Sequence, residues 1–197
     1  RQNVSRIFAA SRLAASMGAQ LVFVEGWRSN RLRRRYGRGQ KVVTGAWLSC
    51  IILRMLRRRG LTEYQGSPHR ADLSRCTAEE ARAVLLLRSR TDGPIIGIAN
   101  CPCPSARRAG RYLRLLGAEH HAVLTPGASI ARYALALDAS QAALLRATEP
   151  GHRETAAGLL SEGASWTVHL LCRVVDLLTG ECMSLEKWLA DRLRWDR

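Results

Sequence analysis

The order of apolar segments between residues 83 and 175 constrains the fold of this chain more than any other feature. Three short apolar runs are typical of strands, and they span residues 83–88, 121–124 and 166–175. Two longer segments with three-and-four apolar spacing predict helices, at residues 105–116 and 125–147. The order strand-helix-strand-helix-strand predicts an α/β (α+β) core in which two helices pack on a small sheet.

A further helix is predicted before this core. Its predicted buried face consists of Trp47, Leu48, Ile51, Ile52, Met55 and Leu56. Thr44 is expected to cap its start and Gly60 to close it. We therefore divide the chain into a basic N-terminal extension with one amphipathic helix (1–62), a linker (63–82), the α/β core (83–176) and a C-terminal helix (177–197).

The charge of the chain is unevenly distributed. The first 62 residues carry fourteen basic side chains and one acid, Glu25, whereas the remaining 135 carry seventeen basic and fifteen acidic side chains. Solvated surfaces normally mix both signs, so this asymmetry indicates a polyanionic partner. Nucleic acid is the favoured partner, and an anionic membrane or an acidic protein are the alternatives.

Arginine supplies most of this charge, and its planar guanidinium binds phosphate in a bidentate manner. Residues 28–41 resemble an arm that becomes ordered on binding, with Tyr36 as a stacking candidate. Trp47, Trp166 and Trp188 lie on apolar stripes and are expected in the core. The predicted RNA-binding residues are Arg28, Arg31, Arg33, Arg34, Arg35, Tyr36, Arg38, Lys41, Arg57, Arg58, Arg59, Arg107, Arg108, Arg111, Arg114 and Arg132.

Motifs for catalysis or metal binding are not evident. The chain has no phosphate-binding GxxxxGK[ST], GxSxG or HExxH pattern. Cys101 and Cys103 match structural zinc spacing poorly, and the six scattered cysteines are expected to be reduced thiols. We therefore expect no enzyme activity, cofactor, metal or small-molecule substrate. The apolar stretch 42–53 is too short for a membrane span, which argues against a membrane partner.

Part of the chain resembles the large-subunit ribosomal protein L-thirty family, over about residues 83–145. The matching motifs are Leu-Leu-Leu-Arg-Ser at 85–89, Tyr-Leu-Arg-Leu-Leu-Gly at 112–117, Val-Leu-Thr-Pro at 123–126 and Ala-Ser-Ile-Ala-Arg at 128–132. The chain departs from the family at Gly127 and Tyr133, where Asp or Asn and Gly are usual. The resemblance implies the same strand-helix-strand-helix-strand unit.

The resemblance also implies a function and a set of partners. It implies a structural constituent of the large ribosomal subunit that binds rRNA and neighbouring ribosomal proteins. The long extensions resemble those of mitochondrial ribosomal proteins, so the mitochondrial matrix is the expected location and the cytoplasmic ribosome the alternative. Residues 1–20 are typical of either a transit segment or a basic arm. The alternative functions are a nucleic-acid-processing enzyme and an accessory subunit of a large mitochondrial membrane complex.

Overall fold

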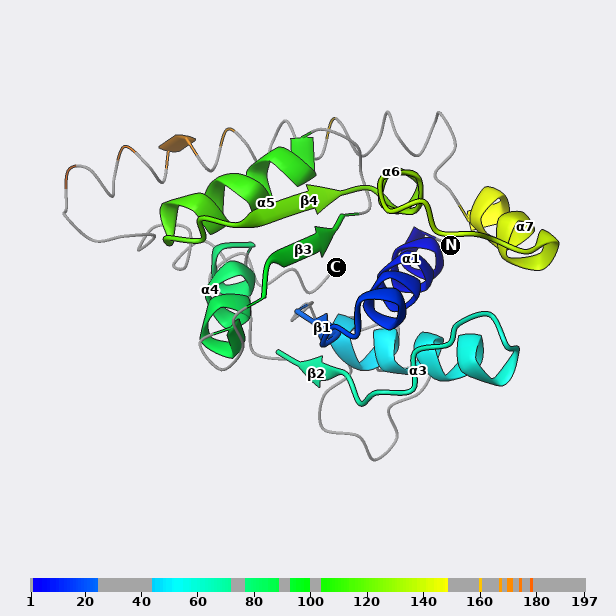
Figure 1. Cartoon of the computed structure of the whole chain (residues 1–197). Coiled ribbons are helices and arrows are strands. Elements are labelled where there is room, and N and C mark those ends of the chain that lie inside the picture. The colour runs from blue at the N-terminus through cyan, green and yellow to red at the C-terminus, as the bar shows by residue number, and fades with distance from the viewer. Residues whose placement is uncertain are drawn as a thin grey trace, which may run out of the picture.

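The computed structural model describes residues 2–24, 44–71, 77–88, 93–99 and 104–148, and six single positions beyond them. Within these residues, six helices accompany two small parallel two-stranded sheets, a mixed α/β arrangement (Figure 1). The helices are α1 (Gln2–Met17), α3 (Gly45–Arg58), α4 (Thr77–Arg88), α5 (Pro104–Leu115), α6 (Pro126–Arg132) and α7 (Ala139–Thr148). The strands are β1 (Val22–Phe23), β2 (His69–Arg70), β3 (Ile95–Ile98) and β4 (His121–Leu124).

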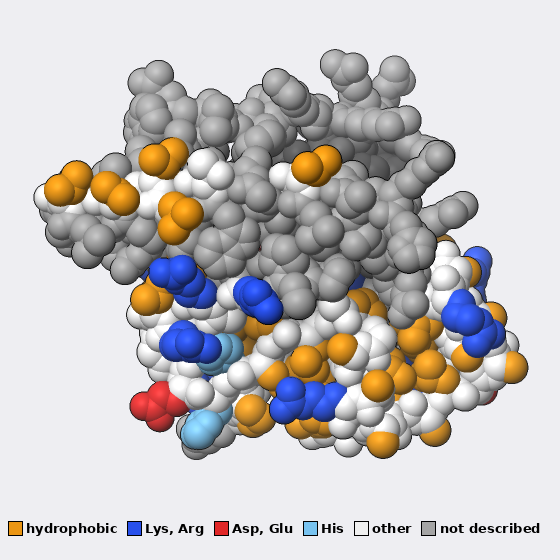
Figure 2. All heavy atoms as spheres, turned by 90° about the horizontal axis from the view of Figure 1, so that it is seen from above, with side chains coloured by type: hydrophobic (Ala, Val, Ile, Leu, Met, Phe, Trp, Pro, Cys, Tyr) orange, Lys and Arg blue, Asp and Glu red, His pale blue; other side chains and the backbone are white. Residues whose placement is uncertain are grey.

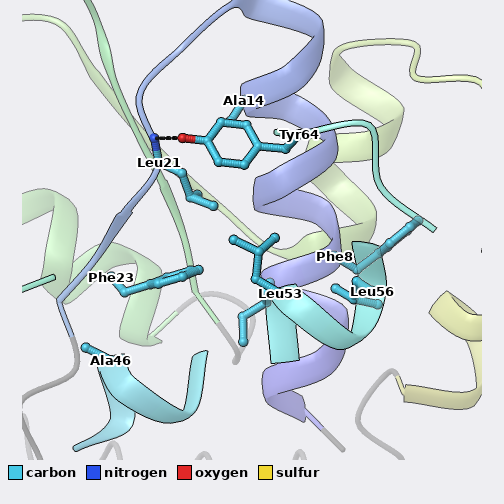
Figure 3. Packing of buried hydrophobic residues seen from close by; sticks show 9 residues of the cluster. Phe8, Ala14, Leu21, Phe23, Ala46, Leu53, Leu56 and Tyr64 are labelled. Carbon is cyan, nitrogen blue, oxygen red and sulfur yellow. Dashed lines mark hydrogen bonds between the residues drawn. The ribbon is translucent and has the colours of Figure 1, made fainter. Parts of the chain in front are cut away.

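The larger buried cluster, here called the first core, is built around α1. It joins α1 to α3, to β1 and to the chain that follows α3 (Figure 3). Its buried residues are Ile7, Phe8, Ala14, Leu21, Phe23, Ala46, Leu53, Leu56 and Tyr64. The Tyr64 hydroxyl satisfies the buried Leu21 backbone N–H at 3.2 Å, as buried polar groups require. The residues expected to form a transit segment or a basic arm thus supply the centre of this core.

The smaller cluster, here called the second core, lies between α4, α5, β3 and β4. Its buried residues are Ala81, Tyr112, Leu113 and Ala118, with half-buried Leu85, Ile95, Leu116 and Val123 packed against them. Strand β3 pairs with β4 in parallel, with Ile95 opposite His121 and Ile98 opposite Leu124. Because parallel strands need a crossover, α5 connects them and packs on the pair.

Two arginines of α1 connect it to other parts of the fold. Arg12 donates from Nη1 to Glu63 Oε1 at 2.8 Å and from Nη2 to the Ala136 carbonyl at 2.6 Å. Burial lowers the pKa of Arg6 to about 10, and the Glu80 carboxylate of α4 acts in the opposite direction. At neutral pH the Arg6 guanidinium remains charged, so its attraction to Glu80 links the first core to α4.

Most helix ends lie where local sequence signals predict them. Thr44 caps α3 by accepting from Trp47 N at 3.1 Å, and Thr125 caps α6 before Pro126. After α3 the Leu61 N–H bonds the Leu56 carbonyl at 2.9 Å, with Gly60 at φ 65°. This is the six-to-one bond of a Schellman cap, whose left-handed residue is usually glycine.

The structure corrects two of the predicted strands. Residues 83–88 belong to α4 and are helical, and the strand that pairs with β4 is β3, at residues 95–98. A short apolar run does not distinguish a strand from a buried helix segment, and Ala, Leu, Glu and Arg are strong helix formers. In the predicted strand 166–175, the described positions 167, 170, 171 and 174 are helical. The arrangement strand-helix-strand-helix-strand is therefore wrong.

The predicted helix 125–147 is also wrong in its extent, because it is two helices. Helix α6 ends where Ala134 takes a left-handed φ of 48°. Helix α7 then begins with a reciprocal capping box. Gln141 N donates to Asp138 Oδ1 at 2.8 Å, and Asp138 N donates to Gln141 Oε1 at 3.2 Å.

The predicted apolar faces of two helices are partly wrong. On α3 the buried residues are Gly45, Ala46, Ser49, Leu53 and Leu56. Met55 is exposed instead, and Trp47 is only half-buried. On α5 the apolar spacing predicts a buried side of Tyr112, Leu115 and Leu116. Tyr112 is buried, but Leu115 is 49% exposed and Leu113 is buried in its place. Apart from position 178, which is helical, the predicted C-terminal helix (177–197) lies outside the described residues, and so do Trp166 and Trp188.

Candidate nucleic-acid interface

The most regular basic surface in the described structure is one side of α5. Arg107, Arg111 and Arg114 are exposed on this helix. Their spacing of four and three residues places them within an arc of about 60°, over about 10 Å of helix. We call these three residues the α5 stripe. Helix α5 is held in this orientation because Tyr112 and Leu113, on its other side, are buried in the second core.

The guanidinium groups of the α5 stripe are available to a ligand. Within the described residues, none of the three forms an ion pair or hydrogen bond. The ion pair between Arg12 of α1 and Glu63 lies elsewhere in the molecule. Arginines that are exposed and without acidic partners retain their full capacity to bind phosphate oxygens.

Two histidines follow α5 along the chain. His120 is exposed, and His121 is half-buried with Nδ1 2.8 Å from the Ala118 carbonyl oxygen. Because a carbonyl oxygen can only accept a hydrogen bond, Nδ1 carries the proton of the neutral ring. Nε2 then carries no proton and lies against Gly110 of α5. His121 therefore helps to position the end of α5 on β4, and neither histidine is needed to explain the basic surface.

Helix α3 carries a second basic surface at its C-terminal end. Arg58 and Arg59 are exposed there. Arg54 is exposed one turn earlier, a position that the sequence prediction omitted. The signal for Arg54 was its spacing of four residues from Arg58, which places both side chains on one side of a helix. These three residues form what we call the α3 end.

Arg57, in the same run, has a different role. It is half-buried, donates from Nε to the Tyr64 carbonyl at 2.7 Å and also donates from Nη2 to the Gly66 carbonyl. Its guanidinium carbon lies 5.4 Å from the centroid of the Tyr64 ring. Arg57 thus fastens the chain after α3 to the helix, and its donors are used inside the protein.

The remaining predicted RNA-binding residues are placed only in part. Arg132 is exposed at the end of α6, and Arg108 lies in α5. The residues of the predicted basic arm lie outside the described part of the chain; they are Arg28, Arg31, Arg33, Arg34, Arg35, Tyr36, Arg38 and Lys41. Cys101 and Cys103 also lie outside it.

The two described basic surfaces lie on different sides of the molecule. Helix α5 runs along one edge in Figure 1, and α3 runs along the opposite edge with α1 between them. Seen from the α5 side, Lys and Arg side chains gather near the histidines (Figure 2). A protein with basic surfaces on two sides fits enclosure by a polyanion better than contact with a single flat surface.

Other chemistry receives no support from the described residues. They contain no group of three His, Cys, Asp or Glu side chains placed to hold a metal ion. None of the helices searched among them is both long and apolar enough to cross a membrane. Comparisons with protein-family models, curated proteins and solved structures found no match to this chain.

Proposed function

We propose that this chain is a non-catalytic RNA-binding component of a ribonucleoprotein particle. The observation that carries the proposal is the α5 stripe, three exposed arginines on one side of a helix with no acidic partner among the described residues. The α3 end supports it from the other side of the molecule. Binding by these groups neutralises phosphates and releases counterions, which requires no reacting group.

The resemblance to ribosomal proteins specifies the particle further. It favours the large ribosomal subunit, in a mitochondrion, with rRNA and neighbouring ribosomal proteins as partners. Helix α5 and strand β4 each overlap in part with a segment that carries the resemblance. The first segment, 85–89, ends a helix where the family has a strand. The proposal therefore depends on the arginines, and the ribosomal assignment on the resemblance.

Salt-dependent binding of the full-length chain to a structured RNA tests the proposal. Replacing all three arginines of the α5 stripe by alanine should weaken binding and make the slope of log K against log salt less steep by about 2, since each lost contact removes ~0.7 to 0.9. Arg146→Ala, an exposed position on α7, provides a control that should leave the slope unchanged. An unchanged slope in the triple variant would show that the α5 stripe does not contact RNA.

The ribosomal assignment needs a separate measurement. The chain should sediment with large ribosomal subunits at moderate salt, and the triple α5 variant should be released at a lower salt concentration than the natural chain. If the chain binds RNA but does not sediment with ribosomal subunits, the ribosomal assignment is wrong and the proposal of RNA binding stands.

A further inference from the structure

The described structure carries two sets of exposed arginines that face away from the two cores. The α5 stripe lies about 180° around its helix from Tyr112 and Leu113, which are buried in the second core. On α3, Arg54 and Arg58 lie about 150° around the helix from the side that is buried in the first core. Both sets therefore point outward, with the cores behind them.

The α3 end is as available to a ligand as the α5 stripe. Arg54, Arg58 and Arg59 are exposed, and among the described residues none of their side chains forms an ion pair or a hydrogen bond. They differ in this from Arg57, whose donors are used inside the protein. Because their guanidinium groups have no acidic partner there, they retain their full capacity to bind phosphate oxygens.

Three elements separate the two arginine sets. Helix α5 packs on β4, β4 pairs with β3, β3 contacts α1, and α1 packs on α3 (Figure 1). Neighbouring helices and sheets lie about 10 Å apart, so the separation of α5 from α3 is on the order of 30 Å. Since the Debye length at physiological salt is ~8 Å, the two sets attract phosphates independently of each other.

One short nucleic-acid duplex cannot contact both sets at once. Double helices are stiff, with a persistence length of about 150 base pairs for DNA, so a duplex of about ten base pairs does not curve around the protein. A duplex bound to the α5 stripe therefore leaves the α3 end open to a second one. Each set neutralises only a few phosphates, so binding to both is much tighter than to either when the two duplexes belong to one folded RNA.

We propose that the α5 stripe and the α3 end bind two different double-helical RNA segments, so that the chain bridges them. Exposed arginines without an acidic partner among the described residues occur at both places, and the same chemistry takes the same class of ligand. The bridging role rests on the proposed function, because it requires that the α5 stripe binds RNA. It adds a second RNA-binding surface and the ability to hold two RNA segments together.

Capture of one RNA duplex by another tests this proposal. One duplex of that short length is immobilised on beads, a fluorescent copy of it is added in solution, and the full-length chain is titrated in. The natural chain should retain the fluorescent duplex on the beads. Retention should be greatest when protein and immobilised duplex are about equal in concentration and should fall at large protein excess, because each duplex then has a protein of its own. Retention that keeps rising with protein would indicate aggregation and would overturn the proposal.

Variants of the two sets show whether both are needed. Arg54→Ala with Arg58→Ala should reduce retention about tenfold, but the variant should still bind a single duplex in solution about twofold more weakly than the natural chain, because one of two sites remains. The triple alanine variant of the α5 stripe should behave in the same way. Arg82→Ala with Arg146→Ala is the matched control, because it removes two exposed arginines of α4 and α7 that belong to neither set. It should leave retention within about twofold of the natural chain, and circular dichroism checks that all variants remain folded.

The remaining outcomes separate bridging from its alternatives. If the α3 variant retains the fluorescent duplex as well as the natural chain does, bridging through the α3 end is wrong, and that surface is left for an acidic protein. If the control loses as much retention as the α3 variant, total charge and not the α3 end is the cause, and the proposal is overturned. If the natural chain binds one duplex but captures no second one, bridging is wrong and the proposed function stands. If it binds no duplex at all, both are wrong.

Discussion

The two cores of this molecule differ in size and in what they present to solvent. The first core buries Phe8, Phe23 and Tyr64 among aliphatic side chains from three regions of the chain. The second core buries four residues, and every residue of β3 and β4 stays half-buried. Since burial of apolar area drives folding, the first core should contribute most of the stability.

The two cores also differ in how the arginines near them are used. The α5 stripe lies on a helix that packs in the second core, whereas Arg57, on a helix that packs in the first core, is used within the protein. Regions with few buried contacts open more readily, and binding surfaces are often drawn from them. The comparison suggests that the first core anchors the molecule and that the second presents its charged surface.

Truncating a buried side chain should destabilise the protein more in the first core than in the second. Phe8→Ala in the first core should lower the free energy of unfolding by about 3–5 kcal/mol. Leu113→Ala in the second core should lower it by about 2–3 kcal/mol, because its half-buried surroundings can relax into the space. Urea denaturation followed by circular dichroism measures both, and hydrogen exchange shows where each variant opens. A larger loss for Leu113→Ala would make the second core the anchor.

Arg57 should contribute to stability, unlike the exposed arginines beside it, because its donors are used inside the protein. Arg57→Met keeps the apolar stem but removes hydrogen bonds from a charged donor to the Tyr64 and Gly66 carbonyls. We expect the free energy of unfolding to fall by about 1.5–3 kcal/mol, as measured by urea denaturation. Arg58→Met, at the exposed neighbouring position, is the control and should change stability little. If the two variants lower the free energy of unfolding equally, the hydrogen bonds of Arg57 do not stabilise the fold, and Arg57 belongs with the exposed arginines that are proposed to bind RNA.

The smallest expected effect lies at the turn between α6 and α7, two helices that both contact α1. Ala134 has a φ of 48°, and the Leu135 N–H bonds the Ile130 carbonyl at 3.1 Å, as in a Schellman cap. Ala134→Gly should raise the free energy of unfolding by about 0.5–1 kcal/mol, because glycine adopts this conformation without a Cβ penalty.

A matched substitution in the same loop tests the cause of that effect. Ala136→Gly, where φ is not positive, should instead lower the melting temperature slightly through added freedom of the unfolded chain. Thermal unfolding of both variants compares them directly. If both substitutions raise the melting temperature, the left-handed φ of Ala134 is not the cause of the stabilisation.

Some of this structure could be predicted residue by residue. The bounds of α3, the end of α5 at Gly117 and the start of α6 at Thr125 agree with the sequence. The break after α6 was not predicted, although the sequence Asp138-Ala-Ser-Gln141 fits the capping box that the structure forms. The apolar spacing continues through residues 125–147 and concealed the break. Ala134 gave no signal either, because alanine is a rare choice at a left-handed cap.

The candidate site was predictable in its charge but not in its geometry. The sequence shows where arginines cluster, and Arg107, Arg111 and Arg114 prove exposed and together. It does not show that Arg57 contacts the Tyr64 ring, because that contact depends on how the chain returns after α3. Nor does it show that Leu115 and Met55 face solvent, since helical spacing defines a face without saying which neighbour covers it.

The sequence alone determined both ends of α3, the start of α6 and the excess of positive charge. Caps are made by side chains and carbonyls within about five residues, so they need nothing distant. Tertiary packing decided that α1 is buried, and which sides of α3 and α5 remain outside. Those outcomes depend on contacts between segments far apart in the chain, and burial against such segments outweighs the fractions of a kcal/mol that local preferences provide.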